Sequence, residues 1–454
     1  MAAFIRSVRG FAFGALVAIA VGTHPSAADA QDGGRTFEHW AATHAAPIRT
    51  VEPGDDTGDL RRLGPVIGSA RAVALGEPAH GAHEPLAFRN RLFRYLVEEL
   101  GFTAIAIESG LPESRRVQDF VAGGPGDTKQ VVRDNLTYGF GGFEENEELV
   151  RWIRDYNANP AHRRKVGFYG IDLSLDGPGE STPTPAALEA AISYLLRVDP
   201  VSAQRLRARV QSFIGRLPEA ESASFSTAEH DALSGAIDDL ISLLEREGPA
   251  LIAATSRTDY EWAHRNAIVA RQAEGMFRVV PPDVAGGGVS PAAGQAINRR
   301  DAAMAANVLW VLAQEGPAGR VLVFAHNAHV MNARLEGGIW SAFARPPSMM
   351  GQSLRSALGD DLVIIGTSSA QNGVGLPAAT PNRDGVDAAL ARVGLPRFLL
   401  DLRAAPADRA LTAWFTERRA LRANFTTYLT LPLGAAFDAI FFVDTLTPAH
   451  TARP

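Results

Sequence analysis

The stretch AVALGEPAHGAHE at residues 72–84 joins a short apolar run to a turn that carries ionisable side chains. The run Ala72–Leu75 is bounded by turn residues, which is typical of a fully buried strand. Gly76, Pro78 and Gly81 then interrupt regular structure. The segment therefore predicts a strand that ends at a loop rich in histidine and glutamate.

Five more apolar runs repeat this pattern. They are Ala104–Ile107, Val166–Tyr169 with Ile171, Val321–Ala325, Leu362–Ile365 and Ala439–Val443. Segments with the helical spacing of apolar residues lie between most of them. Buried strands that alternate with helices indicate an α/β fold, with a mainly parallel sheet flanked by helices.

Residues 186–314 have a different character, because several long helical patterns follow one another without an intervening strand. We interpret this segment as a helical subdomain inserted between the third and fourth strands of one domain at 31–454. The insertion is long enough to form a wall over the sheet. We therefore expect a cleft at the carboxyl ends of the strands.

Ionisable residues follow at least four of the predicted strands. They are Glu77 and His80 after the first, Glu108 after the second, Asp172 after the third, and His326 with His329 after the fourth. Ligands of open α/β sheets bind outside the carboxyl ends of the strands. These side chains are therefore predicted to meet in one site.

Glu77 and His80 form the most informative pair. A carboxylate that accepts from one imidazole nitrogen fixes the tautomer and raises the basicity of the other nitrogen, which suits the ring to activating water. Glu-x-x-His is also a metal motif on helices, but Pro78 argues against a helix here. His83 and Glu84 do not open a His-Glu-x-x-His motif, because Ala87 replaces the second histidine.

Arg89 shares the predicted buried face of a helix over 85–100, whereas Arg91 and Arg94 are expected on the opposite face. A buried guanidinium needs a partner, and Glu77 and Glu108 are the candidates. Arg89 is then either a structural ion pair or a group that fixes a catalytic carboxylate.

Composition excludes several chemistries. Cysteine is absent and only two lysines occur, so thiolate nucleophiles, cysteine-based metal sites and a catalytic lysine are disfavoured. The net charge of −6 and the lack of a basic stretch argue against nucleic acid as a partner. No Gly-x-Ser-x-Gly occurs; Ser368 is the nearest approach, but its segment lacks the last glycine of a nucleophile elbow.

Residues 1–30 are predicted to be a signal peptide. Arg6 and Arg9 precede an apolar stretch, and Ala28-Asp29-Ala30 forms a cleavage site that leaves Gln31 as the first mature residue. An uncleaved anchor is the alternative. We therefore expect a periplasmic or secreted protein that makes no membrane contact after cleavage; its oligomeric state is not predicted.

Taken in order, these motifs resemble the erythromycin esterase family. The resemblance rests on Gly-Glu-Pro-Ala-His-Gly-Ala-His-Glu, the Glu-Ser at 108–109, the Tyr-Gly-Ile-Asp ending at Asp172, the Ala-His-Asn-Ala-His ending at His329, and the tail 437–444. It implies a hydrolase that opens the lactone ester of a macrolide by direct attack of water, without a covalent serine intermediate. Small-molecule esters are the implied partners.

The resemblance also implies the catalytic residues. They are Glu77, His80, Arg89, Glu108 and His326, with His329 as the less favoured match for the last. Which histidine is the base stays open. A zinc ion held by His80, His326 and a glutamate is the alternative, although we favour a site without metal or other cofactor.

Further residues are predicted to bind the substrate. They are His83, Asp172, His329, and the aromatic residues Trp262 and Phe277 on the last long helical stretch of the insertion. The alternative for the two aromatics is packing inside the helical subdomain. The alternative function is a non-catalytic protein that binds haem or another hydrophobic ligand.

Overall fold

The computed structural model describes residues 27–54, 56–173, 184–214, 216, 225–279, 290–373, 382–423 and 427–451. Most of the predicted signal peptide, residues 1–26, lies outside them. Within the described residues, no helix is both long and apolar enough to cross a membrane.

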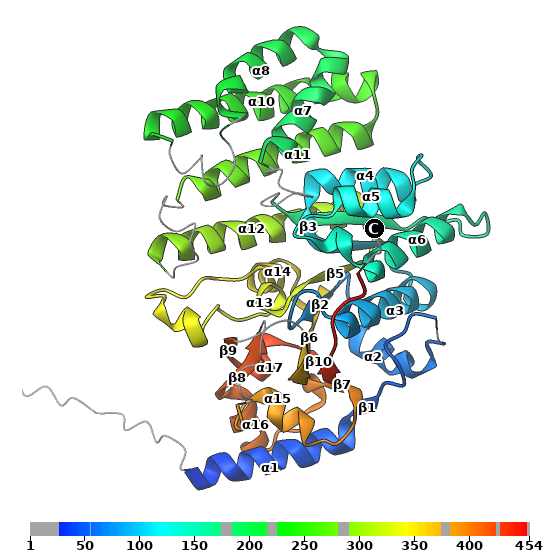
Figure 1. Cartoon of the computed structure of the whole chain (residues 1–454), viewed down its shortest axis with the longest axis vertical. Coiled ribbons are helices and arrows are strands. Elements are labelled where there is room, and N and C mark those ends of the chain that lie inside the picture. The colour runs from blue at the N-terminus through cyan, green and yellow to red at the C-terminus, as the bar shows by residue number, and fades with distance from the viewer. Residues whose placement is uncertain are drawn as a thin grey trace, which may run out of the picture.

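An eight-stranded sheet forms the centre of the molecule, in the order β1-β7-β10-β6-β2-β5-β3-β4 (Figure 1). All six predicted strands are present and form one parallel block. They are β2 (Ala72–Glu77), β3 (Ala104–Gly110), β4 (Gly167–Asp172), β5 (Val321–His326), β6 (Leu362–Asn372) and β10 (Ala439–Leu446). The predicted α/β class with a mainly parallel sheet is confirmed.

Four strands escaped prediction. In the large sheet, β7 (Arg397–Asp401) pairs antiparallel with β10 and with the short β1 (Ala46–Pro47). The strands β8 (Arg418–Ala423) and β9 (Thr427–Pro432) form a separate antiparallel hairpin. In β8 and β9 polar residues interrupt the apolar ones, so neither produces the continuous run by which the buried strands were recognised.

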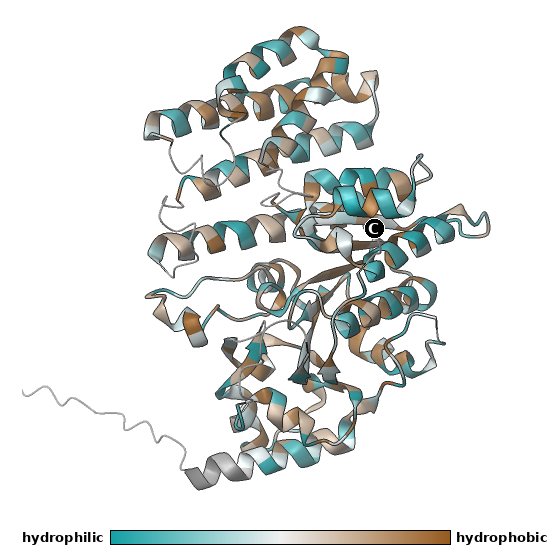
Figure 2. Ribbon diagram, viewed as in Figure 1, coloured by the Kyte–Doolittle hydropathy of each residue, from teal (hydrophilic) through white to brown (hydrophobic). Residues whose placement is uncertain are grey.

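Helices cover both faces of the sheet, and successive strand residues point to opposite faces. Ala74 and Val323 belong to one hydrophobic cluster, whereas Leu75 and Phe324 belong to the other. The first cluster includes residues of α1 (Ala27–His44), α14 (Met350–Leu358), α15 (Val386–Ala391), α16 (Arg409–Thr416) and α17 (Leu433–Ala436). The second includes residues of α2 (Leu63–Ile67), α3 (His83–Leu100), α4 (Leu111–Val121), α5 (Thr128–Asn135) and α6 (Glu144–Ala158). Figure 2 shows hydrophilic residues on the outward side of α4 and α5.

The segment between β4 and β5 is helical in its described part. It holds α7 (Thr184–Val198), α8 (Pro200–Ile214), α10 (Thr227–Ala254), α11 (Arg257–Phe277) and α12 (Pro291–Gln314). Ser226, Ser256 and Ser290 cap the last three helices through their side-chain oxygens. Figure 1 shows most of these helices stacked beyond α12, at the end of the molecule opposite α1. Their apolar residues join the same cluster as one face of the sheet.

Arg91 corrects one expectation about α3. Its side chain is fully buried and donates to Asp59 and to the carbonyl of Thr50, because the chain before α2 covers the face that we expected to meet solvent.

Gly76, near the end of β2, permits a close approach between that strand and Asn327. A Cβ atom there would lie 2.2 Å from Oδ1 of Asn327. The side-chain amide of Asn327 donates to the backbone carbonyl of Thr367 on β6 and accepts from its backbone N–H.

Candidate active site

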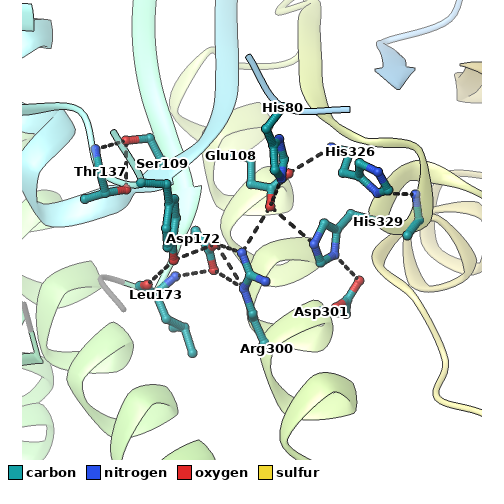
Figure 3. Close-up of polar contacts among 12 residues, drawn as sticks. His80, Glu108, Ser109, Thr137, Asp172, Leu173, Arg300, Asp301, His326 and His329 are labelled. Carbon is teal, nitrogen blue, oxygen red and sulfur yellow. Dashed lines mark hydrogen bonds and ion pairs between the residues drawn. The ribbon is translucent and has the colours of Figure 1, made fainter. Parts of the chain in front are cut away.

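A pocket of about 340 Å³ lies at the carboxyl ends of β2, β3 and β5. Its polar floor and apolar wall are made by His80, Glu108, Tyr138, Phe140, Ile297, Arg300, His326, Ala328, His329, Leu335, Trp340, Met349, Ala423, Thr427 and Leu429. Three predicted catalytic residues, His80, Glu108 and His326, therefore share one pocket. Figure 3 shows the Glu108 carboxylate beside His80 and joined to His329 and to the backbone of His326.

His80 and Glu77 form the predicted pair. Nδ1 of His80 lies 2.7 Å from Oε1 of Glu77, which is 2% exposed at the end of β2. The Nδ1–H therefore donates to the carboxylate, and Nε2 is left with its lone pair. That nitrogen lies 3.9 Å from Oε1 of Glu108, and the side chain is 38% exposed. Burial lowers the pKa of His80, but the charges of Glu108 and Glu77 outweigh burial and raise it above its ordinary value.

Glu108 is held by three donors in addition to its approach to His80. Oε1 accepts from Nη2 of Arg300 at 3.1 Å and from Nε2 of His329 at 3.3 Å, and Oε2 accepts from the backbone N–H of His326 at 2.8 Å. Burial alone raises the pKa of Glu108, yet the charges of His329, His80 and Arg300 hold it well below its usual range. Glu108 is therefore a permanent carboxylate at the centre of the pocket.

His329 is a cation in this arrangement. Its Nδ1 lies 2.9 Å from Oδ1 of Asp301, and its Nε2 faces Glu108, so both ring nitrogens donate to carboxylates. Burial lowers the pKa of His329, but Asp301 and Glu108 together raise it to about 10. His329 therefore cannot act as a base that accepts a proton near neutral pH.

His326 is locked in its neutral form. Nδ1 accepts from the backbone N–H of Ala328 at 3.1 Å, and Nε2 donates to the carbonyl of Pro78 at 3.3 Å. Burial and the nearby charge of His80 lower the pKa of His326 to about 3. With both nitrogens engaged, His326 offers no lone pair to a proton or a metal ion, so the geometry favours His80 as the base.

Arg300 is the cation that the sequence analysis did not single out. From α12 it donates to both carboxylate oxygens of Asp172, which is fully buried, and to Glu108. Asp172 was predicted to bind substrate; instead it is occupied by Arg300, by the hydroxyl of Tyr138 at 3.0 Å and by the N–H of Leu173. Its carboxylate therefore holds the Arg300 guanidinium beside Glu108.

Tyr138 is also new to the site. Its φ is 59°, the left-handed conformation that costs a residue with a side chain roughly 1–3 kcal/mol. The backbone turn aims its ring under the Arg300 guanidinium, 5.5 Å from the ring centre, and its hydroxyl at Asp172. No sequence motif around Tyr138 and Gly139 predicts that this tyrosine belongs to the site.

Arg89 lies buried below the pair of Glu77 and His80, on α3 as predicted. It donates to Oδ1 of Asn90 at 2.7 and 3.0 Å, and it lies over the ring of Phe324. Burial lowers the pKa of Arg89 to about 10, while the charge of Glu77 opposes that shift. Glu77 and Glu108 were the two candidate partners of Arg89, but among the described residues it makes no hydrogen bond to either, and Arg300 donates to Glu108 instead.

Three predicted substrate contacts lie elsewhere. Trp262 is 4% exposed and stacks on Tyr169, and Phe277 is 2% exposed in the same core cluster. These aromatics pack the helical segment, which was the alternative for them. His83 pairs with Glu145 and Glu52, outside the pocket lining. Of the helices between β4 and β5, α12 supplies the lining residues.

The pocket wall comes from segments without a predicted role. They are the stretch 335–349, which includes the 3₁₀ helix η4 (Gly338–Ala342), and the β8–β9 hairpin. Ser368 is absent from the lining. It is fully buried on β6 and donates to Oδ1 of Asp387 at 2.6 Å. No histidine contacts it through a bond that the described residues show, so the serine-hydrolase alternative has no support in the geometry.

The fold and this acid–base pocket at the carboxyl edge of the sheet are typical of a hydrolase. Residues 97–446 match the sequence model of the family described as erythromycin esterase. The chain belongs to that family. The matched range includes Glu108, His326 and His329 but begins after Glu77, His80 and Arg89.

Known proteins support this assignment. Erythromycin esterase type II of Escherichia coli is 28% identical over 349 residues, covering 73% of this chain and 77% of its own length. A Bacillus cereus protein of known crystal structure is 26% identical, with a TM-score of 0.73 and coverage of 92% of this chain and 99% of its own. The erythromycin esterase mutant EreC, in its open conformation, shares the fold with a TM-score of 0.68 at 19% identity, covering 89% of this chain and 98% of its own.

Proposed function

We propose that this protein is an exported hydrolase that cleaves a carboxylic ester or a macrolactone, such as that of an erythromycin-like macrolide. Membership of the erythromycin esterase family supports ester hydrolysis. The observation that carries the mechanism is the position of His80, whose Nδ1 is held by Glu77 while Nε2 faces the pocket. No metal or other cofactor is needed for this chemistry.

In the first step, His80 acts as the general base. A water between Nε2 and the bound ester gives a proton to the ring, and its oxygen attacks the ester carbonyl carbon. The imidazolium that forms lies beside two carboxylates, Glu77 at 2.7 Å and Glu108 at 3.9 Å. Those charges stabilise the protonated ring as it forms.

In the second step, the tetrahedral intermediate collapses. The negative charge that formed on the carbonyl oxygen in the first step lies near the positive charges of Arg300 and His329 until the C=O bond is restored. The bond between the carbonyl carbon and the alcohol oxygen breaks, and the His80 imidazolium returns its proton to the leaving alkoxide. The products are a carboxylic acid and an alcohol, and in a lactone both stay on one opened ring.

The alternative of a haem-like binding protein has less support. An axial ligand requires a free histidine nitrogen or tyrosine hydroxyl. His326 has both nitrogens engaged and Tyr138 donates to Asp172, while Nε2 of His80, the free nitrogen, lies 3.9 Å from the Glu108 carboxylate. A permanently charged Glu108 at the centre of the pocket also disfavours an apolar ligand there.

Incubation with a panel of macrolides and simple esters tests the proposed function. Mass spectrometry of the products is expected to show the addition of one water to at least one lactone. Absence of that change across the whole panel, with a folded protein, would contradict the proposal. A spectral shift on adding haem instead would favour the binding-protein alternative.

The pH dependence of kcat/KM should have an acid limb with an apparent pKa above the ordinary histidine value of about 6.5. His80 must be neutral to accept a proton, and its neighbouring carboxylates raise its pKa, so activity is lost as pH falls through that raised value. Glu77→Gln should move the limb to lower pH, because it removes one of the charges that raise the pKa. A limb that stays in place in this variant would argue against the assignment.

Substitution of two tryptophans distinguishes a residue of the pocket wall from a residue of the core. Trp340→Ala should reduce kcat/KM for a bulky lactone more than for a small ester, because Trp340 lines the pocket and is partly exposed. Trp262→Ala should instead lower the free energy of unfolding by about 3–5 kcal/mol and affect both substrates alike. Equal losses on both substrates in Trp340→Ala would remove that residue from the substrate site.

Export rests on the predicted signal peptide. The charged, apolar and small-residue order of residues 1–30 predicts cleavage after Ala30. N-terminal sequencing of the protein from the periplasmic fraction should give Gln31 as the first residue. Protein that keeps Met1 and stays in the cytosol would overturn this part of the proposal.

A further inference from the structure

His83, Glu145 and His450 form a second cluster of potential ligands, apart from the catalytic pocket. One ligand atom from each lies within 4.8 Å of the other two, and the described residues contain no other such group. The three side chains come from the first residue of α3, from the first turn of α6, and from the chain that follows β10. The end of the chain runs from β10 toward α6 (Figure 1).

Backbone bonds hold these three segments together. The N–H of His83 donates to the carbonyl of Thr447 at 2.8 Å, and the N–H of Ala449 donates to the carbonyl of Gly81 at 2.8 Å. On the other side, the N–H of Glu144 donates to the carbonyl of His450 at 2.8 Å. These bonds fix the relative positions of the three segments that carry the cluster.

We propose that His83, Glu145 and His450 bind a divalent transition-metal ion of the zinc class. Two imidazole nitrogens and one carboxylate are a common zinc ligand set, and bonds of about 2.0–2.1 Å place tetrahedral ligands roughly 3.3 Å apart. Nδ1 of His450 already lies 3.5 Å from Oε1 of Glu145. Nδ1 of His83 lies 2.7 Å from the same oxygen, as a proton between them requires. The metal ion takes the place of that proton, which is released to solvent.

Two further observations support a metal ligand set. Oε2 of Glu145 is buried and has no hydrogen-bond partner among the described residues, although Glu145 is only 4% exposed. The second ring nitrogen of His83, Nε2, lies 3.0 Å from Oε1 of Glu52. A carboxylate behind a metal-bound histidine fixes the tautomer and orientation of the ring. His450 is 61% exposed, so the fourth position opens to water.

A metal ion there would join the chain end and α6 to the turn that carries His80. It would lie outside the proposed hydrolysis, because none of its three ligands lines the catalytic pocket. The proposal therefore predicts effects on metal affinity and thermal stability, and these readouts do not depend on knowing the substrate.

Titration of the untagged, chelator-treated full chain with Co²⁺ and Zn²⁺ tests the site. We expect saturation at one equivalent, followed by absorption for Co²⁺ and by calorimetry for Zn²⁺, and a higher Tm with zinc. His450→Ala should abolish that binding. Glu52→Gln should weaken it by about 10–100-fold, the usual effect of losing a carboxylate behind a metal-bound histidine. His39→Ala, which removes an exposed imidazole on α1, should bind like the unmodified chain.

Three results would overturn the proposal. One is the absence of stoichiometric binding, which would leave His83 and Glu145 as an ordinary ion pair. Another is unchanged affinity in His450→Ala. The third is loss of binding in His80→Ala with retention in His450→Ala, which would place the metal in the catalytic pocket.

Discussion

His80→Ala is expected to reduce kcat/KM for the ester substrate by about 10²–10⁴-fold, the usual cost of removing a general base. In the structure, His80 combines an engaged nitrogen with one that faces the pocket. His326 has both nitrogens engaged, and His329 is already protonated because its pKa is about 10. No other histidine of the pocket lining can therefore replace His80.

A second substitution controls for loss of the contact with Glu77. His80→Asn places an amide N–H where Nδ1 donates to Glu77 but cannot take a proton from water, so it should lose a similar amount of activity. Added imidazole should restore part of the rate in His80→Ala. Retention of more than about half the activity in either folded variant would show that another group is the base.

Glu108→Gln is expected to cause a comparable loss of activity together with a loss of stability. The substitution leaves Arg300 and His329 without their shared carboxylate, and removal of one partner from a buried ion pair typically costs about 3–5 kcal/mol. The amide also brings an NH₂ group toward the backbone N–H of His326, unless its oxygen turns that way and the NH₂ group instead faces Arg300 and His329.

The pH profile distinguishes a catalytic from a purely structural effect of Glu108. Its charge raises the pKa of both His80 and His329, so Glu108→Gln should move the acid limb of kcat/KM to lower pH. Glu98→Gln, an exposed carboxylate on α3, should change neither activity nor the limb. A Glu108→Gln variant with the original limb and nearly full activity would refute the role assigned to this residue.

The parallel part of the fold could be predicted from the sequence because its strands are buried on both faces. Such strands read as unbroken apolar runs, and each run begins or ends within a few residues of an observed strand boundary. The antiparallel strand β7 and the hairpin β8–β9 could not be found in this way. Their apolar residues are few or interrupted by polar ones, and the hairpin strands are only partly buried.

The same difference explains which site residues could be predicted. Glu77, His80, Glu108 and His326 follow strands of one parallel sheet, so the topology alone brings them to one edge. Arg300 reaches the site from the middle of a helix far along the chain. Nothing in the helical pattern around it shows which face meets the sheet.

Burial and side-chain direction explain why three of the predicted substrate contacts do not line the pocket. Trp262 and Phe277 lie on a helix that is apolar on more than one side, and sequence spacing cannot say which side meets a pocket and which meets another helix. His83 follows His80 by three residues, yet the chain turns into α3 at His83 and directs its side chain toward Glu145. Side-chain direction at a helix start depends on the tertiary contacts of the turn.

The central claim is that water activated by His80 attacks the ester directly, without an acyl-enzyme. Rapid acid quenching during turnover of a hydrolysed lactone, followed by intact-protein mass spectrometry, tests it most directly. The account predicts only the mass of the unmodified chain at every time point, while the lactone gains one water. A transient increase in protein mass equal to the acyl group would contradict it and would require a nucleophile such as a serine or a carboxylate in the pocket.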